Sequence, residues 1–164
     1  MFSMTRSSVL LACGLFLASS AFAAQHTYPG AMCVKANESS SNKGTAKVDN
    51  NAQLLNSSAT NDLTVVCPVV GPYNDLSGTP PENKAEVFVH DAHFDEDVCC
   101  SARANNVGVV HFGPQVCTSG TDTRYKTLQM TTPSIGFTFT SRYFLCTIPE
   151  TYLGNRSSIH LYRY

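Results

Sequence analysis

The chain has 164 residues, of which 43% are hydrophobic and 14% are charged, and its formal net charge is −1. This length suits one domain and is sufficient to bury a hydrophobic core. Nucleic-acid binding needs a basic face, so this charge balance predicts no nucleic-acid partner. The same balance provides no attraction toward an acidic membrane surface.

The first 23 residues have the pattern of a secretory signal peptide. Arg6 supplies a positive region, Val9–Ala18 is an apolar or small-residue run too short to cross a bilayer, and Ala21–Ala23 supplies small residues for cleavage. No later segment is long and apolar enough to span a membrane. We therefore predict a single mature domain over residues 24–164, located in the periplasm or outside the cell.

The sequence contains seven cysteines, and one of them, Cys13, lies in the signal segment. There Leu10–Cys13 resembles a lipobox, although the apolar run continues past Cys13. An even number of cysteines in an exported chain predicts disulfides rather than zinc, because zinc sites use close pairs such as CxxC. The six remaining cysteines are Cys33, Cys67, Cys99, Cys100, Cys117 and Cys146.

Short runs rich in Val, Thr, Tyr and Phe recur along the mature chain and are separated by turn residues. They cover 31–34, 46–54 (weakly), 63–70, 85–90, 98–104, 107–112, 124–130, 136–149 and 157–164. A long surface loop is expected over 71–84, and Pro68 indicates a sheet edge or a bulge. Without a sustained helical period, the pattern predicts an all-β fold. We expect an antiparallel, jelly-roll-like β-sandwich with about seven to nine short strands.

Five blocks occur in the order YPGAMC, LTVVCPVV, AEVFVHDAHF, YFLCTIP and SSIHLYRY. Together they resemble a family of uncharacterised secreted bacterial proteins that have a signal peptide and a small disulfide-bearing β domain. The resemblance covers most of the mature chain and implies export, but it implies no activity. The resemblance associates Cys33, Cys67, Cys100 and Cys146 with the family, and it therefore implies that Cys99 and Cys117 are an additional pair.

Six cysteines allow 15 disulfide pairings, and the sequence alone does not choose among them. Neighbouring residues of a strand point to opposite faces, so Cys99 and Cys100 should have separate partners. This geometry and the family resemblance together motivate one hypothesis. It pairs Cys99 with Cys117, Cys100 with Cys146, and Cys33 with Cys67.

The stretch HDAHFDED, His90–Asp97, is dense in groups that bind metals or protons. If the preceding strand continued, the alternate residues from Asp91 to Asp97 would face the core. Burying three carboxylates and an imidazole there without a metal would be very costly. We therefore predict that the strand stops near His90, and that a polar loop leads to a new strand at Val98.

A metal site is the alternative interpretation of this stretch. Asp91, His93 and Asp95 have the one-three-five spacing of a calcium loop, but Glu96 and Ala102 replace the glycine and the final glutamate. Two histidines three residues apart point to opposite faces of a straight strand, which makes them poor zinc co-ligands. We expect neither a metal nor a cofactor.

No catalytic motif of the GxSxG, HExxH or P-loop type is present. His111 and His160 lie in apolar runs, which favours a structural or surface role over that of a catalytic base. Glu82, Glu86 and Glu150 are available for a glycosidase pair, but nothing singles them out. We expect no catalytic residue and no enzyme, with a small secreted hydrolase as a secondary alternative.

The predicted function is a non-catalytic extracellular structural or binding role, with a carbohydrate-binding module as the first alternative. The chain has no Trp to stack on a sugar, but it has seven Tyr. Tyr162 and Tyr164 share the parity of His160 and could form an aromatic stripe, although aromatic residues more often pack in a core. Three Asn-X-Ser sequences indicate polar loops in a bacterial protein: Asn37, Asn56 and Asn155.

Overall fold

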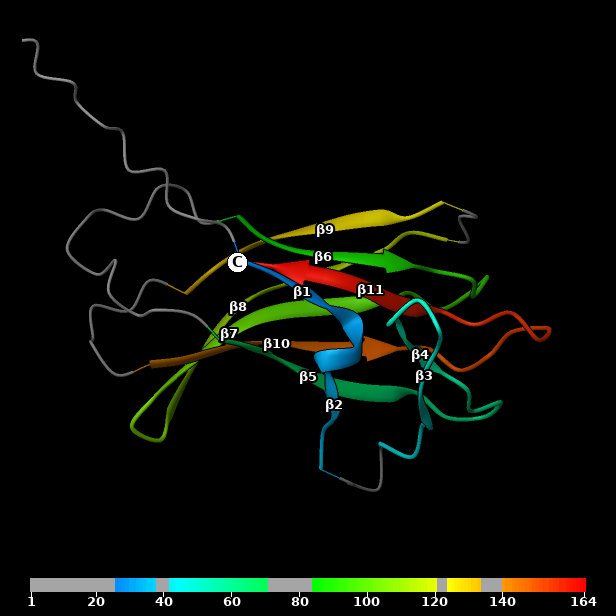
Figure 1. The fold of residues 1–164 in the computed structure, drawn as a ribbon, viewed down its shortest axis with the longest axis horizontal. Coiled ribbons are helices and arrows are strands. Elements are labelled where there is room, and N and C mark those ends of the chain that lie inside the picture. Colours follow the sequence, from blue (N-terminus) through cyan, green and yellow to red (C-terminus); the bar gives the residue numbers. More distant parts are fainter. Residues whose placement is uncertain (1–25, 38–41, 71–83, 121–123, 134–139) are drawn as a thin grey trace, which may run out of the picture.

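The computed structural model describes residues 26–37, 42–70, 84–120, 124–133 and 140–164. Two antiparallel β-sheets pack against each other around one hydrophobic core (Figure 1). The predicted all-β sandwich is therefore confirmed. The predicted signal peptide lies outside the described residues, and so does the loop expected over 71–84 except for its last residue, Lys84, which begins a strand.

The first sheet, sheet A, has six strands in the order β3-β4-β11-β6-β9, and β1 pairs with β11. Its strands are β1 (Thr27–Pro29), β3 (Ala46–Val48), β4 (Leu54–Asn56), β6 (Lys84–His90), β9 (Lys126–Thr131) and β11 (Ser158–Arg163). The second sheet, sheet B, has five strands in the order β2-β5-β10-β7-β8. Its strands are β2 (Val34–Lys35), β5 (Leu63–Val69), β7 (Cys99–Asn106), β8 (Val109–Cys117) and β10 (Thr140–Ile148).

The longer strands coincide with the predicted runs, whereas the start of the chain differs. The strand predicted over 31–34 is wrong, because Gly30–Met32 forms a short 3₁₀ helix, η1, between β1 and β2. The chain passes there from sheet A to sheet B. Gly30 allows this crossing, since a Cβ at this position would lie 2.1 Å from the carbonyl oxygen of Ile159. The strand count exceeds the prediction because β1 to β4 have only two or three residues each.

The core forms between the two sheets because apolar residues alternate along their strands. In β6 the side chains of Ala85, Val87 and Val89 are fully buried, and β5 shows the same period of two. Tyr162 of β11 contacts Phe144 of β10, with ring centroids 5.7 Å apart, and so joins the sheets. Burial raises the pKa of Tyr162, and its hydroxyl donates a hydrogen bond to the carbonyl oxygen of Pro68 at 2.7 Å.

All three predicted disulfides are present: Cys33–Cys67, Cys99–Cys117 and Cys100–Cys146. Cys99 lies opposite Cys117 on β8, and Cys100 lies opposite Cys146 on β10. The two neighbouring cysteines of β7 therefore link it to the strand on each side. All three bridges involve strands of sheet B, because Cys33 precedes β2 and Cys67 belongs to β5.

The aromatic stripe considered at the end of the chain does not form. The pairing of β11 with β6 shifts between Ile159 and Leu161, so His160 is the extra residue of a β-bulge. Tyr162 is fully buried in the core, and only part of Tyr164 reaches the surface. The prediction for Pro68 is confirmed in its edge form, because β2 pairs with β5 only at Val65 and Val66 and ends before Pro68.

Asn56 is not in a polar surface loop, contrary to the prediction. Its side chain is fully buried in β4. Its amide nitrogen donates hydrogen bonds to the carbonyl oxygens of Asn61, Ile148 and Pro149, and its Oδ1 accepts two backbone N–H groups. Asn56 therefore holds β4, which belongs to sheet A, against the end of β10 in sheet B.

Candidate functional site

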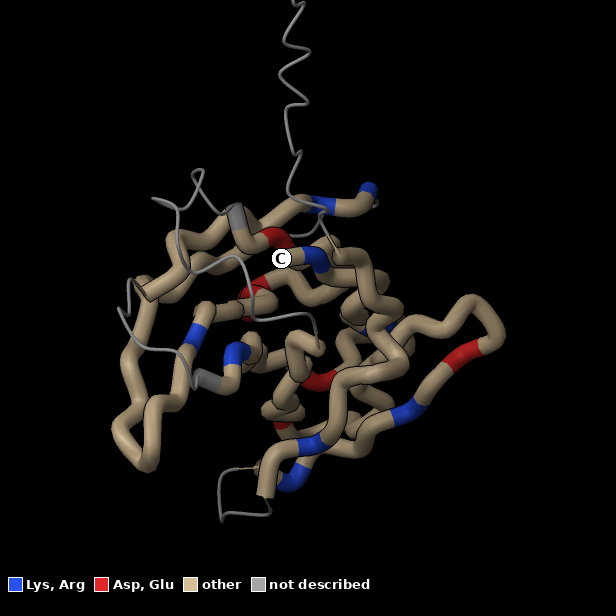
Figure 2. Tube along the Cα trace, turned by 60° about the vertical axis from the view of Figure 1, so that its left-hand side comes forward, with Lys and Arg blue, Asp and Glu red and all other residues tan. Residues whose placement is uncertain are grey.

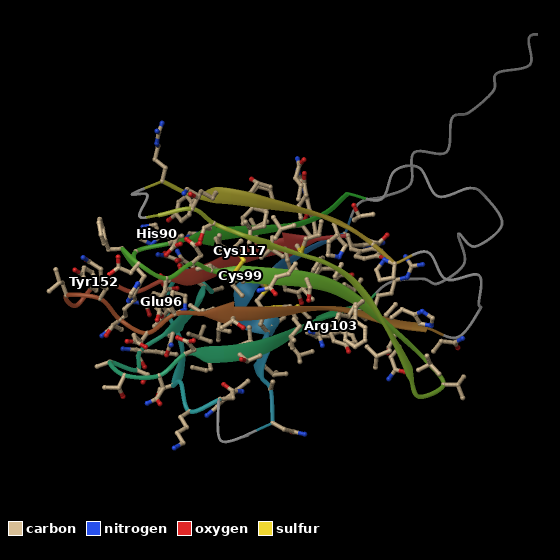
Figure 3. All side chains as sticks on the ribbon, turned by 180° about the vertical axis from the view of Figure 1, so that it is seen from behind. His90, Glu96, Cys99, Arg103, Cys117 and Tyr152 are labelled. Atoms are coloured by element: carbon tan, nitrogen blue, oxygen red, sulfur yellow. A yellow bond between two sulfur atoms is a disulfide. The ribbon has the colours of Figure 1, made fainter. Side chains whose placement is uncertain are left out.

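The chemically reactive side chains gather at one end of the sandwich. β6 and β10 end there, and β5, β7, β9 and β11 begin there, so the loops over 57–62, 91–98 and 149–157 meet. Figure 3 shows His90, Glu96 and Tyr152 together at this end, while Arg103 lies further along the sandwich. Acidic and basic residues elsewhere are dispersed along the described trace (Figure 2).

Asp91 anchors the loop that follows β6. The strand ends at His90 and β7 begins at Cys99, close to the predicted limits. Asp91 is nevertheless fully buried. Its carboxylate accepts hydrogen bonds from the hydroxyls of Thr118 and Ser157 and from the backbone N–H groups of His93 and Val98. These four donors satisfy the carboxylate without a metal, so Asp91 ties three loops together.

His93 is also buried, with 7% of its surface exposed, and it shapes the same loop. Its Nδ1 accepts the backbone N–H groups of Asp95 at 3.2 Å and Glu96 at 2.9 Å. A neutral ring that accepts at Nδ1 has its proton on Nε2. Neither nitrogen then offers a free lone pair to a metal ion or to the proton of a nucleophile. The ring edge packs on Tyr152, with centroids 5.0 Å apart.

A carboxylate cluster lies beside His93. One donor atom from each of His93, Glu96 and Glu150 lies within 4.8 Å of the other two. Asp62 is within side-chain hydrogen-bonding reach of Glu96. Burial raises the pKa of Glu96, and the charges of Asp62 and Glu150 raise it further, while His93 opposes them. The cluster thus brings together three acidic groups from three distant segments.

A second group, here called the aromatic patch, consists of Tyr125, His90 and His160. Tyr125 precedes β9 and is 60% exposed. Its ring contacts His160 with centroids 3.8 Å apart and His90 with centroids 6.0 Å apart. The Nε2 of His160 is buried without a hydrogen-bond partner among the described residues. Burial lowers the pKa of His160, which favours the neutral ring.

The residues that the sequence offered for a glycosidase pair or a calcium loop do not come together in the structure. Glu86 is buried on β6, where it pairs with Arg163 and accepts a hydrogen bond from Gln129, so it is not a partner for Glu150. Glu82, the third glutamate available for a glycosidase pair, lies outside the described residues. The calcium-loop spacing does not produce a site either, because Asp91 is satisfied by its four donors and does not join the carboxylate cluster.

Comparisons with known proteins give the fold little further context. No family model and no curated protein matches the chain. A solved structure of a family two carbohydrate esterase from Cellvibrio japonicus resembles it with a TM-score of 0.47 and 10% sequence identity. The likeness covers 85% of this chain and 33% of the esterase chain, so this chain spans about a third of that protein. Likeness at this level carries no inference about activity.

Within the described residues, no helix has the length and apolar character that crossing a membrane requires. Three disulfides suggest an oxidising environment, extracellular or periplasmic.

Proposed function

We propose that this protein is an exported, non-catalytic binding domain and that its ligand is a carbohydrate. The observation that supports this is the aromatic patch at the loop end. The ring of Tyr125 is 60% exposed and is supported at its edge by two histidines from neighbouring strands. A fixed, exposed ring offers an apolar surface to the C–H groups of a sugar, while its hydroxyl and adjacent polar groups can hydrogen-bond to sugar hydroxyls.

A non-catalytic role is supported by the state of the reactive groups. The six cysteines of the mature chain are paired, so none offers a thiolate. His93 has its Nδ1 occupied by two backbone N–H groups. The Nε2 of His160 is buried and has no hydrogen-bond partner among the described residues. A general base must reach the proton that it removes, and neither of these histidines is placed to do so.

Export is supported by the disulfides and by the signal-like N-terminal sequence. A sugar-binding domain with these properties would act on the cell surface or on polysaccharide outside the cell.

The test is binding of the oxidised protein to a glycan array, followed by calorimetry with the best oligosaccharide. Tyr125→Ala should abolish binding because it removes the exposed ring. Phe112→Ala is the matched control, since Phe112 is an aromatic residue that is 66% exposed and lies opposite Arg103 in sheet B, away from the loop end. An array without hits, or equal loss in both variants, would refute the proposal.

A further inference from the structure

The hairpin formed by β7 and β8 projects from the sandwich at the end opposite the loop end (Figure 1). The two residues of its turn, Val107 and Gly108, have positive φ angles of 46° and 89°. This is the pattern of a type I′ turn, which prefers Asn-Gly because a β-branched residue rarely adopts a positive φ. Val107 nevertheless occupies the tip and is 89% exposed. The hairpin thus presents an apolar side chain at its tip in spite of local backbone strain.

Exposed apolar side chains lie on both faces of the hairpin behind this tip. Val109 pairs with Asn106, and Phe112 pairs with Arg103. Because Val109 and Phe112 are three residues apart on one strand, their side chains point to opposite faces, and both are exposed. A folded partner or a second copy of this chain would cover one face of the hairpin, whereas a fluid apolar layer surrounds whatever enters it. The distribution therefore favours lipid as the partner.

The charges of the hairpin are complementary to an anionic surface. Residues 99–117 contain no Asp or Glu, and Arg103 is their only Lys or Arg. The guanidinium of Arg103 lies over the exposed ring of Phe112, 4.8 Å from its centroid. At the same end of the sandwich, Glu86 is buried and paired with Arg163. The hairpin therefore places one cation, and no anion, beside its exposed aromatic ring.

We propose that the β7–β8 hairpin inserts its tip into the surface of a membrane that contains anionic lipids. A strand rises by about 3.3 Å per residue, so Phe112 lies about 10 Å behind Val109 along β8. Val107 and Val109 then reach the boundary of the acyl chains. The ring of Phe112 and the guanidinium of Arg103 stay among the headgroups, which favour aromatic rings and cations. The net charge of the whole chain provides no attraction to such a surface, so the contact depends on this hairpin.

This inference goes beyond the proposed sugar binding and does not depend on it. The hairpin tip and the aromatic patch lie at opposite ends of the sandwich, because β7 ends where β9 also ends and Tyr125 precedes β9. Phospholipid vesicles contain no sugar, and Tyr125→Ala should bind them as the natural protein does. A glycan array without hits would therefore leave the membrane proposal intact, and failure to bind vesicles would leave the sugar proposal intact.

The experiment is sedimentation of the oxidised protein with vesicles of phosphatidylcholine alone, and of phosphatidylcholine and phosphatidylglycerol in equal parts. The mixed vesicles should bind the protein about fivefold more tightly, because one cation near an anionic surface contributes about that factor, and Arg103→Gln should remove the difference. Val107→Asn should weaken binding by about tenfold or more, which is the effect of losing a buried valine side chain. The same variant should not lower the melting temperature, since Asn before Gly suits this turn.

Leu153→Asn is the matched control. Leu153 also has a positive φ before a glycine in a tight turn and is 84% exposed, but its turn is at the loop end, three residues after Glu150. Its binding should equal that of the natural sequence. Any of four results would overturn the proposal: no binding to either vesicle, no preference for the mixed vesicles, equal weakening by Leu153→Asn and Val107→Asn, or a dimer in lipid-free solution that Val107→Asn converts to a monomer. Light scattering tests the last of these, which would make the tip a contact between copies of the chain.

Discussion

At the scale of single residues, the loop end depends on buried polar side chains that are satisfied internally. Asp91 is the clearest case, because it is fully buried and accepts hydrogen bonds from two hydroxyls and two backbone N–H groups. A buried carboxylate in this position stabilises the fold because its hydrogen bonds offset the cost of removing its charge from water. The residue therefore acts as the junction of the loops around 91, 118 and 157.

Asp91→Ala should lower the free energy of unfolding by about 3 kcal/mol or more. The substitution removes the acceptor of the Ser157 hydroxyl and of the His93 backbone N–H, and each hydrogen bond to a charged group is worth about 1.5–3 kcal/mol. Urea denaturation of the oxidised protein measures the effect. The exposed neighbour Asp95→Ala should change stability by no more than about 0.5 kcal/mol. Equal effects of the two substitutions would show that the hydrogen bonds of Asp91 contribute nothing.

His160 predicts a pH dependence of stability. Burial holds the pKa of His160 below its usual value; the charge of Asp49 opposes this shift, and His90 adds a smaller lowering. The unfolded chain, with a histidine pKa of about 6.5, then binds a proton before the folded protein does. Stability is therefore complete above about pH 6.5 and is lost as the pH falls through the lower pKa of the folded state. Urea denaturation between pH 7.5 and 5 should show this loss, and His160→Asn should reduce it. An unchanged pH profile in the variant would contradict the assignment.

At the scale of elements, strand β7 shows what the sequence predicts well. Two adjacent cysteines in a strand must face opposite ways. The prediction of separate partners that follows from this rule is confirmed, because the partners lie on β8 and β10. The apolar run over 63–70 and the alternation over 85–90 also located β5 and β6 closely. The 3₁₀ crossing at Gly30 and the bulge at His160 were not predicted. Both arise from contacts with distant strands, which leave no local pattern.

The disulfide Cys99–Cys117 should be reduced before the other two. Cys117 is exposed and Cys99 is partly exposed, whereas the other four cysteines are at most 3% exposed. A reductant reaches an exposed sulfur without opening the core. Limited phosphine reduction, alkylation and peptide mapping should therefore label Cys99 and Cys117 first. Labelling of Cys100 and Cys146 at the same rate would show that reduction requires global opening.

At the scale of the whole molecule, the fold class could be predicted but the group of acidic residues beside His93 could not. Asp62 and Glu150 stand at the ends of two apolar runs that are more than eighty residues apart in the sequence. Only the register of β5 with β10, which places Leu63 opposite Ile148, brings these acids together. The sequence does show that each of these acidic residues flanks the end of a strand. It does not show which strands pair with each other, because the pattern along one strand carries no information about its neighbours.

The distribution of disulfides makes the two sheets unequal. All three bridges fasten sheet B, and none involves a strand of sheet A. Sheet A is attached through the core and through hydrogen bonds such as those of Asn56. A disulfide limits the conformations of an opened chain, so opening sheet B gains less entropy than opening sheet A.

Hydrogen exchange under mildly denaturing conditions should therefore separate the two sheets. We expect amides of β6, β9 and β11 to exchange faster than those of β5, β7 and β10 in the oxidised protein, because sheet A can open while sheet B remains closed. Mass spectrometry of peptides from these strands measures the difference. Reduction of all three disulfides should remove the additional protection of sheet B. If both sheets instead exchange together in the oxidised protein, the sandwich opens as one cooperative unit, and core packing rather than the cross-links determines its stability.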